Sequence, residues 1–380
     1  MSQQVQNNGM YAVGDKLFFN KVNAILEDKI SNRGVEYRFH DEIYSKHNWS
    51  VEPEESLESL YARRAWELRN KYDYLVLHFS GGSDSANVLE TFIKNKIPLD
   101  EIFIRGPISK VDKNINNTDP SNMFAEVFLN AIPIAEYVKK YFLPNVRISV
   151  KDTSQFSIDY FKNNKEWFSP DKIVPAFTPH IAWCTQLDVL DPTYVKLTEA
   201  GKRVAHIVGI DKPMVYYENN QFVVKFLDQR VYLSPLGFLS HTMKVPMFQE
   251  PFYWSTSTAK LIIKQSHAVK NFIKNTGIDP GILNRKMDRA WHDFMAGIIY
   301  KRTLPLYFVP QKSPGGMVQP WDRFFFAEGL LSSHGKSWFN GISELSDLIP
   351  DHWKHEEDRP LLNDSNSIKG IFSKSYYIGN

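Results

Sequence analysis

The stretch YLVLHFSGGSDSANVLETF, residues Tyr74–Phe92, decides the fold of this chain. It begins with six almost continuously apolar residues, which is typical of a central parallel strand covered on both faces. The apolar run stops at SGGSDS, residues Ser80–Ser85, and a helix-like spacing of apolar residues follows from Ser85 to Ile97. The stretch therefore predicts a buried strand, a tight polar loop and a helix in direct succession.

Strands and helices are expected to alternate around this stretch. Helices are predicted at Ser56–Lys71 and at Ala125–Phe142, and Pro133 should interrupt the second one. Further strands are predicted by short apolar runs at Asp100–Arg105, Asn145–Val150 and Arg203–Ile210. Such alternation is the pattern of βαβ units, so the sequence predicts an α/β fold with a Rossmann-like parallel sheet and helices on both faces.

The pattern changes after the last of these strands. Two β-rich runs flank Asn219-Asn220, which predicts a hairpin with a tight turn because Asn tolerates positive φ. Helical patterns then extend over Thr258–Gly277 and Asn284–Tyr300. We therefore divide the chain into a partly helical N-terminal extension (1–70), a parallel-sheet domain (71–213), and a hairpin followed by a mainly helical C-terminal region (214–380).

The composition indicates a sizeable core and little net charge. The chain has 380 residues, of which 43% are hydrophobic, and its formal net charge is +2. This near balance does not indicate nucleic-acid binding, although a local basic patch stays compatible with it. No run of about 18 apolar residues occurs, so we expect no membrane partner. The N-terminal residues lack a basic start followed by an apolar core, so we expect no secretory signal and a cytoplasmic location.

The loop Ser80–Ser85 combines residues that suit a phosphate site. Gly81 and Gly82 allow the backbone to bend sharply and to approach a ligand closely, while Ser80, Ser83 and Ser85 supply hydroxyl groups. The following helix directs its free N–H groups and its positive dipole end toward the same place. Asp84 alone would repel phosphate, and its presence is explained if Mg²⁺ bridges it to phosphate oxygens. An ordinary turn with capping residues is the structural alternative.

The motif S-G-G-x-D-S, matched at every specified position from Ser80 to Ser85, resembles the PP-loop of the N-type ATP pyrophosphatases. The loop matches neither the P-loop pattern nor the dinucleotide fingerprint. The resemblance covers Tyr74–Phe92 directly, and the alternating pattern extends it to about Asp211. It implies that ATP and Mg²⁺ bind here and that ATP is cleaved to AMP and pyrophosphate. A substrate oxygen would attack the α-phosphate to give an adenylate, from which a nucleophile would displace AMP.

Two further strand ends supply candidate site residues. Arg105 and Gly106 end the second predicted strand and would border the nucleotide base, although a plain strand-ending turn explains them equally well. The segment VGIDKP ends a later strand and should face the same crevice. There Gly209 would lie beside the phosphates, Asp211 would hold the same Mg²⁺ ion as Asp84 or a second one, and Lys212 would neutralise charge on the α- or β-phosphate. A solvent-facing turn is again the alternative.

The single cysteine, Cys184, separates this chain from several relatives in that superfamily. It excludes an internal disulfide and a thiolate-rich metal site within one chain. The catalytic cysteine that follows the initiator Met in glutamine-dependent asparagine synthetase is replaced here by Ser2. We therefore expect ammonia, if it is used, to be free or supplied by a separate donor. Reductase chemistry and tRNA thiolation, which need further cysteines, are disfavoured.

The expected function is that of an adenylating ligase, most similar in layout to the synthetase domain of asparagine synthetase. It would activate a carboxylate, amide or carbonyl of a small-molecule acceptor for nitrogen transfer, with the C-terminal region shaping the acceptor site. Two alternatives stay open. One is tRNA or nucleobase modification within the same superfamily, for which binding should weaken steeply with salt. The other is a nucleotide-binding or structural module without turnover.

Overall fold

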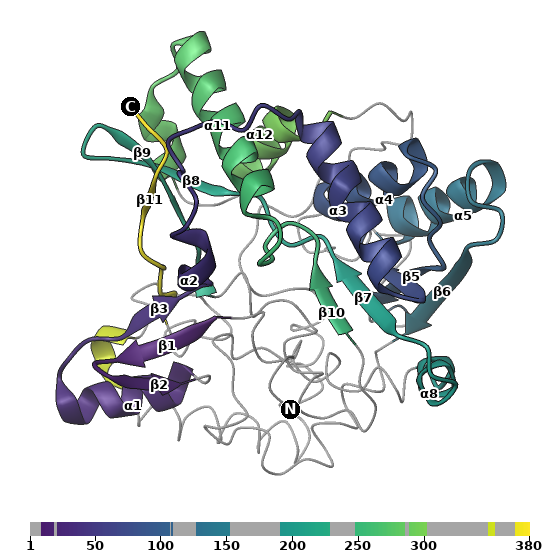
Figure 1. Cartoon of the computed structure of the whole chain (residues 1–380), viewed down its shortest axis with the longest axis horizontal. Helices are drawn as coiled ribbons and strands as arrows, with labels where there is room; N and C mark the ends of the chain where they lie inside the picture. The colour runs from purple at the N-terminus through teal and green to yellow at the C-terminus, as the bar shows by residue number, and fades with distance from the viewer. Residues whose placement is uncertain are drawn as a thin grey trace.

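The computed structural model of the chain describes residues 9–18, 21–106, 108, 127–152, 191–228, 248–285, 289–301, 349–353 and 369–380. Its central feature is a five-stranded parallel sheet (Figure 1). The strands lie in the order β10 (Phe248–Pro251), β7 (Val204–Val208), β4 (Tyr74–His78), β5 (Glu101–Gly106) and β6 (Arg147–Asp152). The prediction of an α/β fold with a parallel sheet is therefore confirmed.

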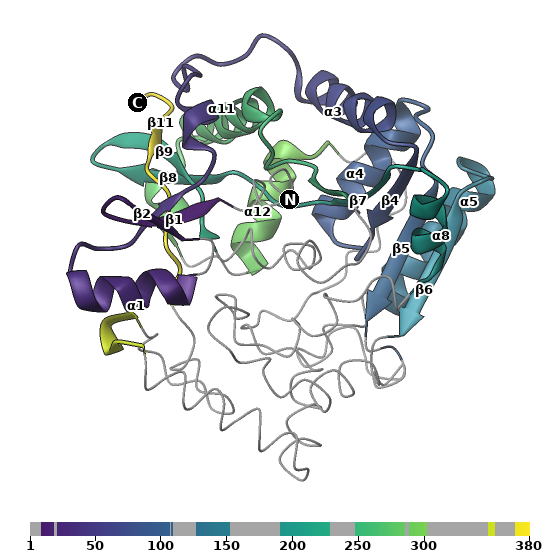
Figure 2. The ribbon, with the colours of Figure 1, turned by 60° about the horizontal axis from the view of Figure 1, so that its bottom comes forward.

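The central strand β4 is buried on both faces, as its apolar sequence predicted. Leu75 and Leu77 pack into the larger hydrophobic core, and Val76 packs into a smaller core on the opposite face of the sheet. Helices α3 (Leu57–Lys71), α4 (Ser83–Lys94) and α5 (Ile132–Tyr141) cover the first face. Helix α8 (Thr193–Glu199) covers the second face (Figure 2), and its Tyr194 belongs to the same small core as Val76. Helices thus flank both faces of the sheet.

The helix boundaries follow local chemistry. Helix α3 begins after Ser56, whose side chain accepts a hydrogen bond from the Ser59 amide. Helix α4 begins at Ser83, two residues before the predicted start. The predicted interruption by Pro133 is confirmed, because a π-helical turn over Val127–Ala131 precedes α5 and the proline occupies its first turn.

The remaining described elements form two smaller antiparallel sheets and several helices. One sheet contains β8 (Met214–Glu218), β9 (Gln221–Lys225) and β11 (Tyr376–Tyr377). Its hairpin turns at Asn219 and Asn220, with φ of 50° and 59°, as predicted. The other sheet contains β1 (Met10–Val13), β2 (Lys16–Phe18) and β3 (Glu36–Arg38). The short helices beside them are α1 (Lys21–Ser31), α2 (Asp41–Tyr44), and 3-10 turns at Pro280–Asn284 and Asp351–Trp353.

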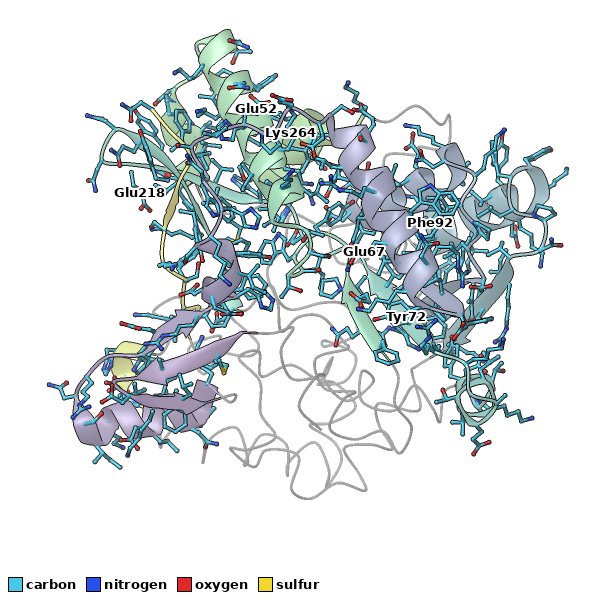
Figure 3. The ribbon with its side chains drawn as sticks, viewed as in Figure 1. Glu52, Glu67, Tyr72, Phe92, Glu218 and Lys264 are labelled. Carbon is cyan, nitrogen blue, oxygen red and sulfur yellow. The ribbon has the colours of Figure 1, made fainter. Side chains whose placement is uncertain are left out.

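Two longer helices follow β10. Helix α11 (Ala259–Thr276) ends at Gly277, whose φ of 68° terminates it as predicted. Helix α12 (Arg289–Ile299) begins later than the predicted Asn284, because residues up to Asn284 form a separate 3-10 turn. An ion pair of 2.7 Å between Lys264 Nζ and Glu52 Oε1 fastens α11 to the segment that precedes α3 (Figure 3). Among the described helices, none combines the length and apolarity needed to cross a bilayer.

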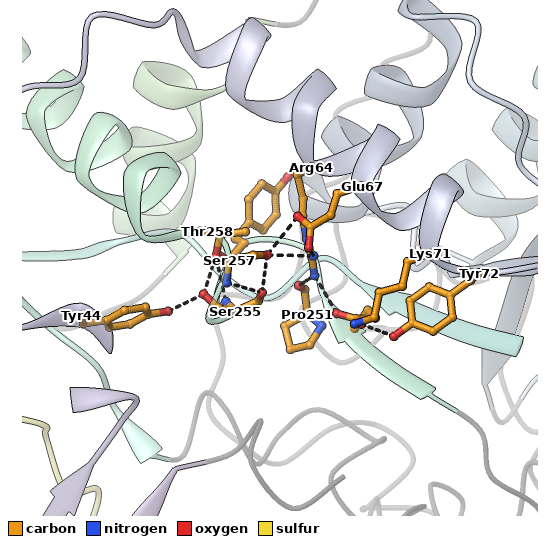
Figure 4. A network of polar contacts seen from close by, with 11 residues as sticks. Tyr44, Arg64, Glu67, Lys71, Tyr72, Pro251, Ser255, Ser257 and Thr258 are labelled. Atoms are coloured by element: carbon orange, nitrogen blue, oxygen red, sulfur yellow. Dashed lines mark hydrogen bonds and ion pairs between the residues drawn. The ribbon is translucent and has the colours of Figure 1, made fainter. Parts of the chain in front are cut away.

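A buried polar network attaches the edge strand β10, which was not predicted, to α3 (Figure 4). Arg64 is 3% exposed and donates through Nη2 to Glu250 Oε2 at 2.8 Å and to the Pro251 carbonyl at 2.9 Å. Lys71 Nζ and the Tyr72 hydroxyl donate to the other carboxylate oxygen of Glu250. A buried charge must be paired and hydrogen-bonded in this way to be tolerated, so the network fixes the position of β10.

Candidate functional site

The candidate site lies where the strand order reverses. From β4 the chain proceeds to β5 and β6 on one side, and then crosses to β7 and β10 on the other. Because β4 and β7 are parallel neighbours, the loops that follow them leave the same edge of the sheet side by side. Ligands of open parallel sheets bind beyond the carboxyl ends of the strands at such a reversal. The two loops that carry most of the predicted site residues are therefore brought together.

The loop after β4 is tight and internally bonded. Gly81 has a φ of +80°, and a Cβ added to it would lie 3.0 Å from the Ala131 amide nitrogen. The Gly82 amide donates to Ser80 Oγ at 3.2 Å, and Ser85 Oγ donates to the Gly82 carbonyl at 3.1 Å. Only glycine adopts this conformation without strain and fits the space at residue 81. The loop therefore directs the N-terminus of α4 outward from the sheet edge.

The loop after β7 packs directly on the first turn of α4. A Cβ added to Gly209 would lie 2.9 Å from both the carbonyl carbon of Asp84 and the amide nitrogen of Ser85. Since these are backbone atoms, no side-chain rearrangement can make room for it. The absence of a side chain at Gly209 thus allows the two loops to pack backbone against backbone.

Asp84 and Lys212 form the charged centre of the site. Lys212 Nζ lies 2.7 Å from Asp84 Oδ1 and 2.6 Å from Oδ2. The Lys212 side chain is only 3% exposed, whereas that of Asp84 is 25% exposed. A buried ammonium needs a compensating anion, and Asp84 supplies it. The sequence prediction that these two residues share a site agrees with this geometry.

Asp211 is a second carboxylate near the same ammonium. Its Oδ1 is 3.9 Å from Lys212 Nζ and accepts a hydrogen bond of 2.6 Å from the Lys212 amide. The carboxylates of Asp84 and Asp211 therefore both lie within 4 Å of one ammonium. Within the described ranges, no group of three or more His, Cys, Asp or Glu side chains could hold a metal ion by itself. Mg²⁺, however, is commonly held by one or two carboxylates together with substrate phosphates, so this pair fits it.

Arg105 and Gly106 end β5, one strand farther from the loop after β7, and pair in register with Lys151 and Asp152 of β6. The charge of Arg105 acts on a histidine pair on the α8 side of the sheet. His78 Nε2 lies 2.9 Å from His206 Nδ1. Burial first, and then the charge of Arg105, lower the pKa of both imidazoles, to about 3 for His206. The two rings therefore stay neutral at physiological pH.

The structure adds two tyrosines that sequence reasoning missed. The Tyr300 hydroxyl donates to Asp84 Oδ1 at 2.6 Å, and the Tyr253 hydroxyl donates to the Asp84 carbonyl at 3.0 Å. Asn87 Nδ2 donates in turn to the Tyr253 hydroxyl at 2.9 Å. No local motif marks these residues, because Tyr253 and Tyr300 are 169 and 216 positions away from Asp84. Tertiary packing of α4 against the segment after β10 and the end of α12 brings them there.

Cys184 lies outside the described residues.

Neither models of protein families nor curated proteins give a match to this chain. Its function is therefore inferred from the geometry and chemistry of the site.

Proposed function

We propose that this protein is an ATP-dependent adenylating enzyme of the PP-loop type, which cleaves ATP to AMP and pyrophosphate. One observation carries the proposal. The complete S-G-G-x-D-S motif lies at the reversal of strand order, starts a helix, and has Lys212 of the neighbouring loop bonded to its aspartate. A glycine-rich bend, a helix N-terminus and a buried cation at one sheet edge are the features that a triphosphate requires.

Different residues of this chain would bind different parts of the triphosphate. Helix α4 begins at Ser83, and the free N–H groups of its first turn would bind pyrophosphate oxygens. Ser80, which is exposed, would add a hydroxyl donor at the rim of the loop. Lys212 would place its ammonium against the α- or β-phosphate. Positioning and charge neutralisation of this kind are the main contributions of a protein to phosphoryl and nucleotidyl transfer.

The carboxylate of Asp84 is suited to hold Mg²⁺ through one oxygen. An ionised carboxylate has about four acceptor positions. Among the described residues, Lys212 and Tyr300 use both positions of Oδ1, and Lys212 uses one of Oδ2. The free position on Oδ2 would accept the cation, with Asp211 as the second carboxylate. When bound, Mg²⁺ would neutralise phosphate charge and connect the phosphates to these acids.

The acceptor is proposed to be a small molecule that carries a carboxylate, amide or carbonyl oxygen. That oxygen would form a bond to the α-phosphorus while the bond between the α-phosphorus and the bridging oxygen breaks, so that pyrophosphate leaves. An amine or ammonia from a separate donor would then displace AMP. This reaction is the one proposed from the resemblance of the loop motif, that of a ligase similar to the synthetase domain of asparagine synthetase.

The substitution Asp84→Asn tests this function. We expect it to abolish the Mg²⁺-dependent release of AMP and pyrophosphate from ATP, measured with a panel of amino and keto acids plus ammonium. Asp73→Asn is the matched control, because Asp73 lies at the opposite end of β4 and pairs with Arg203 on the surface. It should keep wild-type activity. AMP release by the Asp84→Asn protein at the wild-type rate would contradict the assigned role.

A nucleotide-binding module without turnover is the second candidate, and one observation favours it. Lys212 and Tyr300 already occupy three of the acceptor positions of Asp84. Binding of α,β-methylene-ATP, which cannot be cleaved between its α- and β-phosphates, separates the candidates without knowledge of the acceptor. Binding of this analogue without AMP release from ATP for any acceptor would support the module, and AMP release would support the enzyme.

A further inference from the structure

Tyr300 contacts the site from a distant part of the chain. It follows the last residue of α12, and its side chain is almost completely buried. Its ring packs against those of Tyr253 and Tyr61, with centroids 5.7 Å and 6.4 Å away. Since the neighbouring rings restrict the orientation of Tyr300, its hydroxyl is directed at a fixed point.

The Tyr300 hydroxyl is a permanent donor. A tyrosine phenol is protonated at physiological pH, so the Tyr300 hydroxyl is available as a donor to Asp84. A protonated phenol beside an ionised carboxylate makes a charge-assisted hydrogen bond, which is stronger than a bond between neutral groups. The 2.6 Å contact with Asp84 Oδ1 is of this kind.

The other two rings of the cluster serve as internal comparisons. The Tyr61 hydroxyl donates to the Ile299 carbonyl at 3.0 Å, and the Tyr253 hydroxyl donates to the Asp84 carbonyl. Both satisfy a buried phenol on the backbone, which is the ordinary requirement of folding. In this cluster, the bond of Tyr300 to Oδ1 of Asp84 is the one that reaches a charged side-chain atom, so its effect extends to what the carboxylate can bind.

We propose that Tyr300 determines which divalent cation the site accepts, by keeping Oδ1 of Asp84 occupied so that only Oδ2 can bind the cation. This inference rests on the proposed function, in which Asp84 binds Mg²⁺. Mg²⁺ requires a near-octahedral shell of single oxygens, whereas Ca²⁺ also accepts both oxygens of one carboxylate. A carboxylate restricted to one oxygen therefore favours Mg²⁺. Loss of the Tyr300 hydroxyl frees a position on Oδ1 and allows both oxygens to bind.

The test compares Tyr300→Phe with Tyr61→Phe. Each removes a single hydroxyl from the same buried cluster, but only the first exposes a position on Asp84. Mn²⁺ bound in the presence of α,β-methylene-ATP is followed by electron paramagnetic resonance, and is displaced by Mg²⁺ or by Ca²⁺. We expect Tyr300→Phe to lower the ratio of Mg²⁺ to Ca²⁺ affinity about tenfold, which is the effect of one additional favourable contact. The ratio for Tyr61→Phe should equal that of the wild type, because a general loosening of the cluster would lower the affinities for Mg²⁺ and Ca²⁺ to the same extent.

Asp84→Asn, run in the same assay, separates the two levels of the argument. If it abolishes Mn²⁺ binding and Tyr300→Phe leaves the Mg²⁺ to Ca²⁺ ratio unchanged, the inference about Tyr300 is wrong while the proposed function stands. If Mn²⁺ binds the Asp84→Asn protein as it binds the wild type, Asp84 does not hold the cation, and both proposals are overturned. Thermal unfolding serves as the control for folding. Equal midpoint temperatures for Tyr300→Phe and Tyr61→Phe would show that a difference in cation binding does not come from a difference in stability.

Discussion

The substitution Gly209→Ala should disturb the candidate site and the stability of the protein together. The new methyl carbon would lie 2.9 Å from the carbonyl carbon of Asp84 and from the amide nitrogen of Ser85, and 3.1 Å from the Ser85 Cα. Ordinary contacts of a Cβ begin at about 3.4 Å, so the strand end and the first turn of α4 must separate by about 0.5 Å. Overpacking of this size costs about 1–3 kcal/mol of unfolding free energy.

Gly297→Ala is the matched control with the opposite sign. Gly297 lies in α12 with nothing within 4 Å of its added Cβ, and its φ is not positive. Alanine should therefore stabilise the protein by about 0.5–1 kcal/mol, because it restricts the unfolded chain and favours the helix. Both variants exchange the same two residue types, so a loss of stability in Gly209→Ala with a gain in Gly297→Ala would point to the contact at Gly209.

Two measurements test whether the two loops pack closely at Gly209. Urea unfolding gives the free energies of the two variants, and titration with α,β-methylene-ATP gives their nucleotide affinities. We expect Gly209→Ala to lose both stability and affinity, since the amides proposed to bind phosphate belong to the displaced turn. A Gly209→Ala protein within about 0.5 kcal/mol of the wild type, which is typical of an unconstrained surface position, and with unchanged affinity would refute the close packing of the two loops.

Two further predictions concern stability. Glu250→Gln should cost about 1.5–3 kcal/mol at pH 7, because it removes the more buried of the two carboxylates that pair with the Arg64 guanidinium and leaves it Glu67 alone. Burial alone raises the pKa of Glu250, but Arg64, Lys71 and Tyr72 hold it below its ordinary value, so its contribution is lost as the pH falls. The difference in unfolding free energy between Glu250→Gln and the wild type, measured with urea, should therefore become smaller below about pH 4.5. A difference that stays constant with pH would contradict this expectation. The pKa of His206 is lowered to about 3, so its buried neutral ring contributes fully to the unfolding free energy above about pH 6.5. About 2 kcal/mol of that contribution should be lost by pH 5, because the unfolded chain takes up the proton first. His206→Gln should flatten this part of the pH profile, and an equally steep profile would show that the buried pair is not its source.

Local sequence patterns predicted those elements whose structure depends on neighbouring residues. The apolar run of β4, the amphipathic helix α3, the interruption at Pro133 and the turn at Asn219-Asn220 each follow from local periodicity or short-range sterics. Strand β10 was not predicted, because it lacks such a local pattern. Its four residues, FQEP, carry little apolar character, and their position depends on the buried network around Glu250.

Residues from neighbouring strand ends were partly predictable. Parallel strands end at a common edge, so Asp84 and Lys212, 128 positions apart, were expected to face one crevice, and the structure brings them into contact. The direct bond between them was not predicted, since strand order does not specify which side chains meet. Arg105 lies on a neighbouring strand, where its charge acts on the histidine pair.

By itself, then, the sequence determined the parallel-sheet class of the fold and the loop most suited to phosphate, because periodicity and glycine content express local backbone preferences. Tertiary structure alone decided what surrounds Asp84. Tyr300 and Tyr253 reach it from segments with no motif, through the packing of α4 against distant elements of the chain. Such contacts depend on how buried surfaces fit together in three dimensions, and a one-dimensional pattern does not encode that fit.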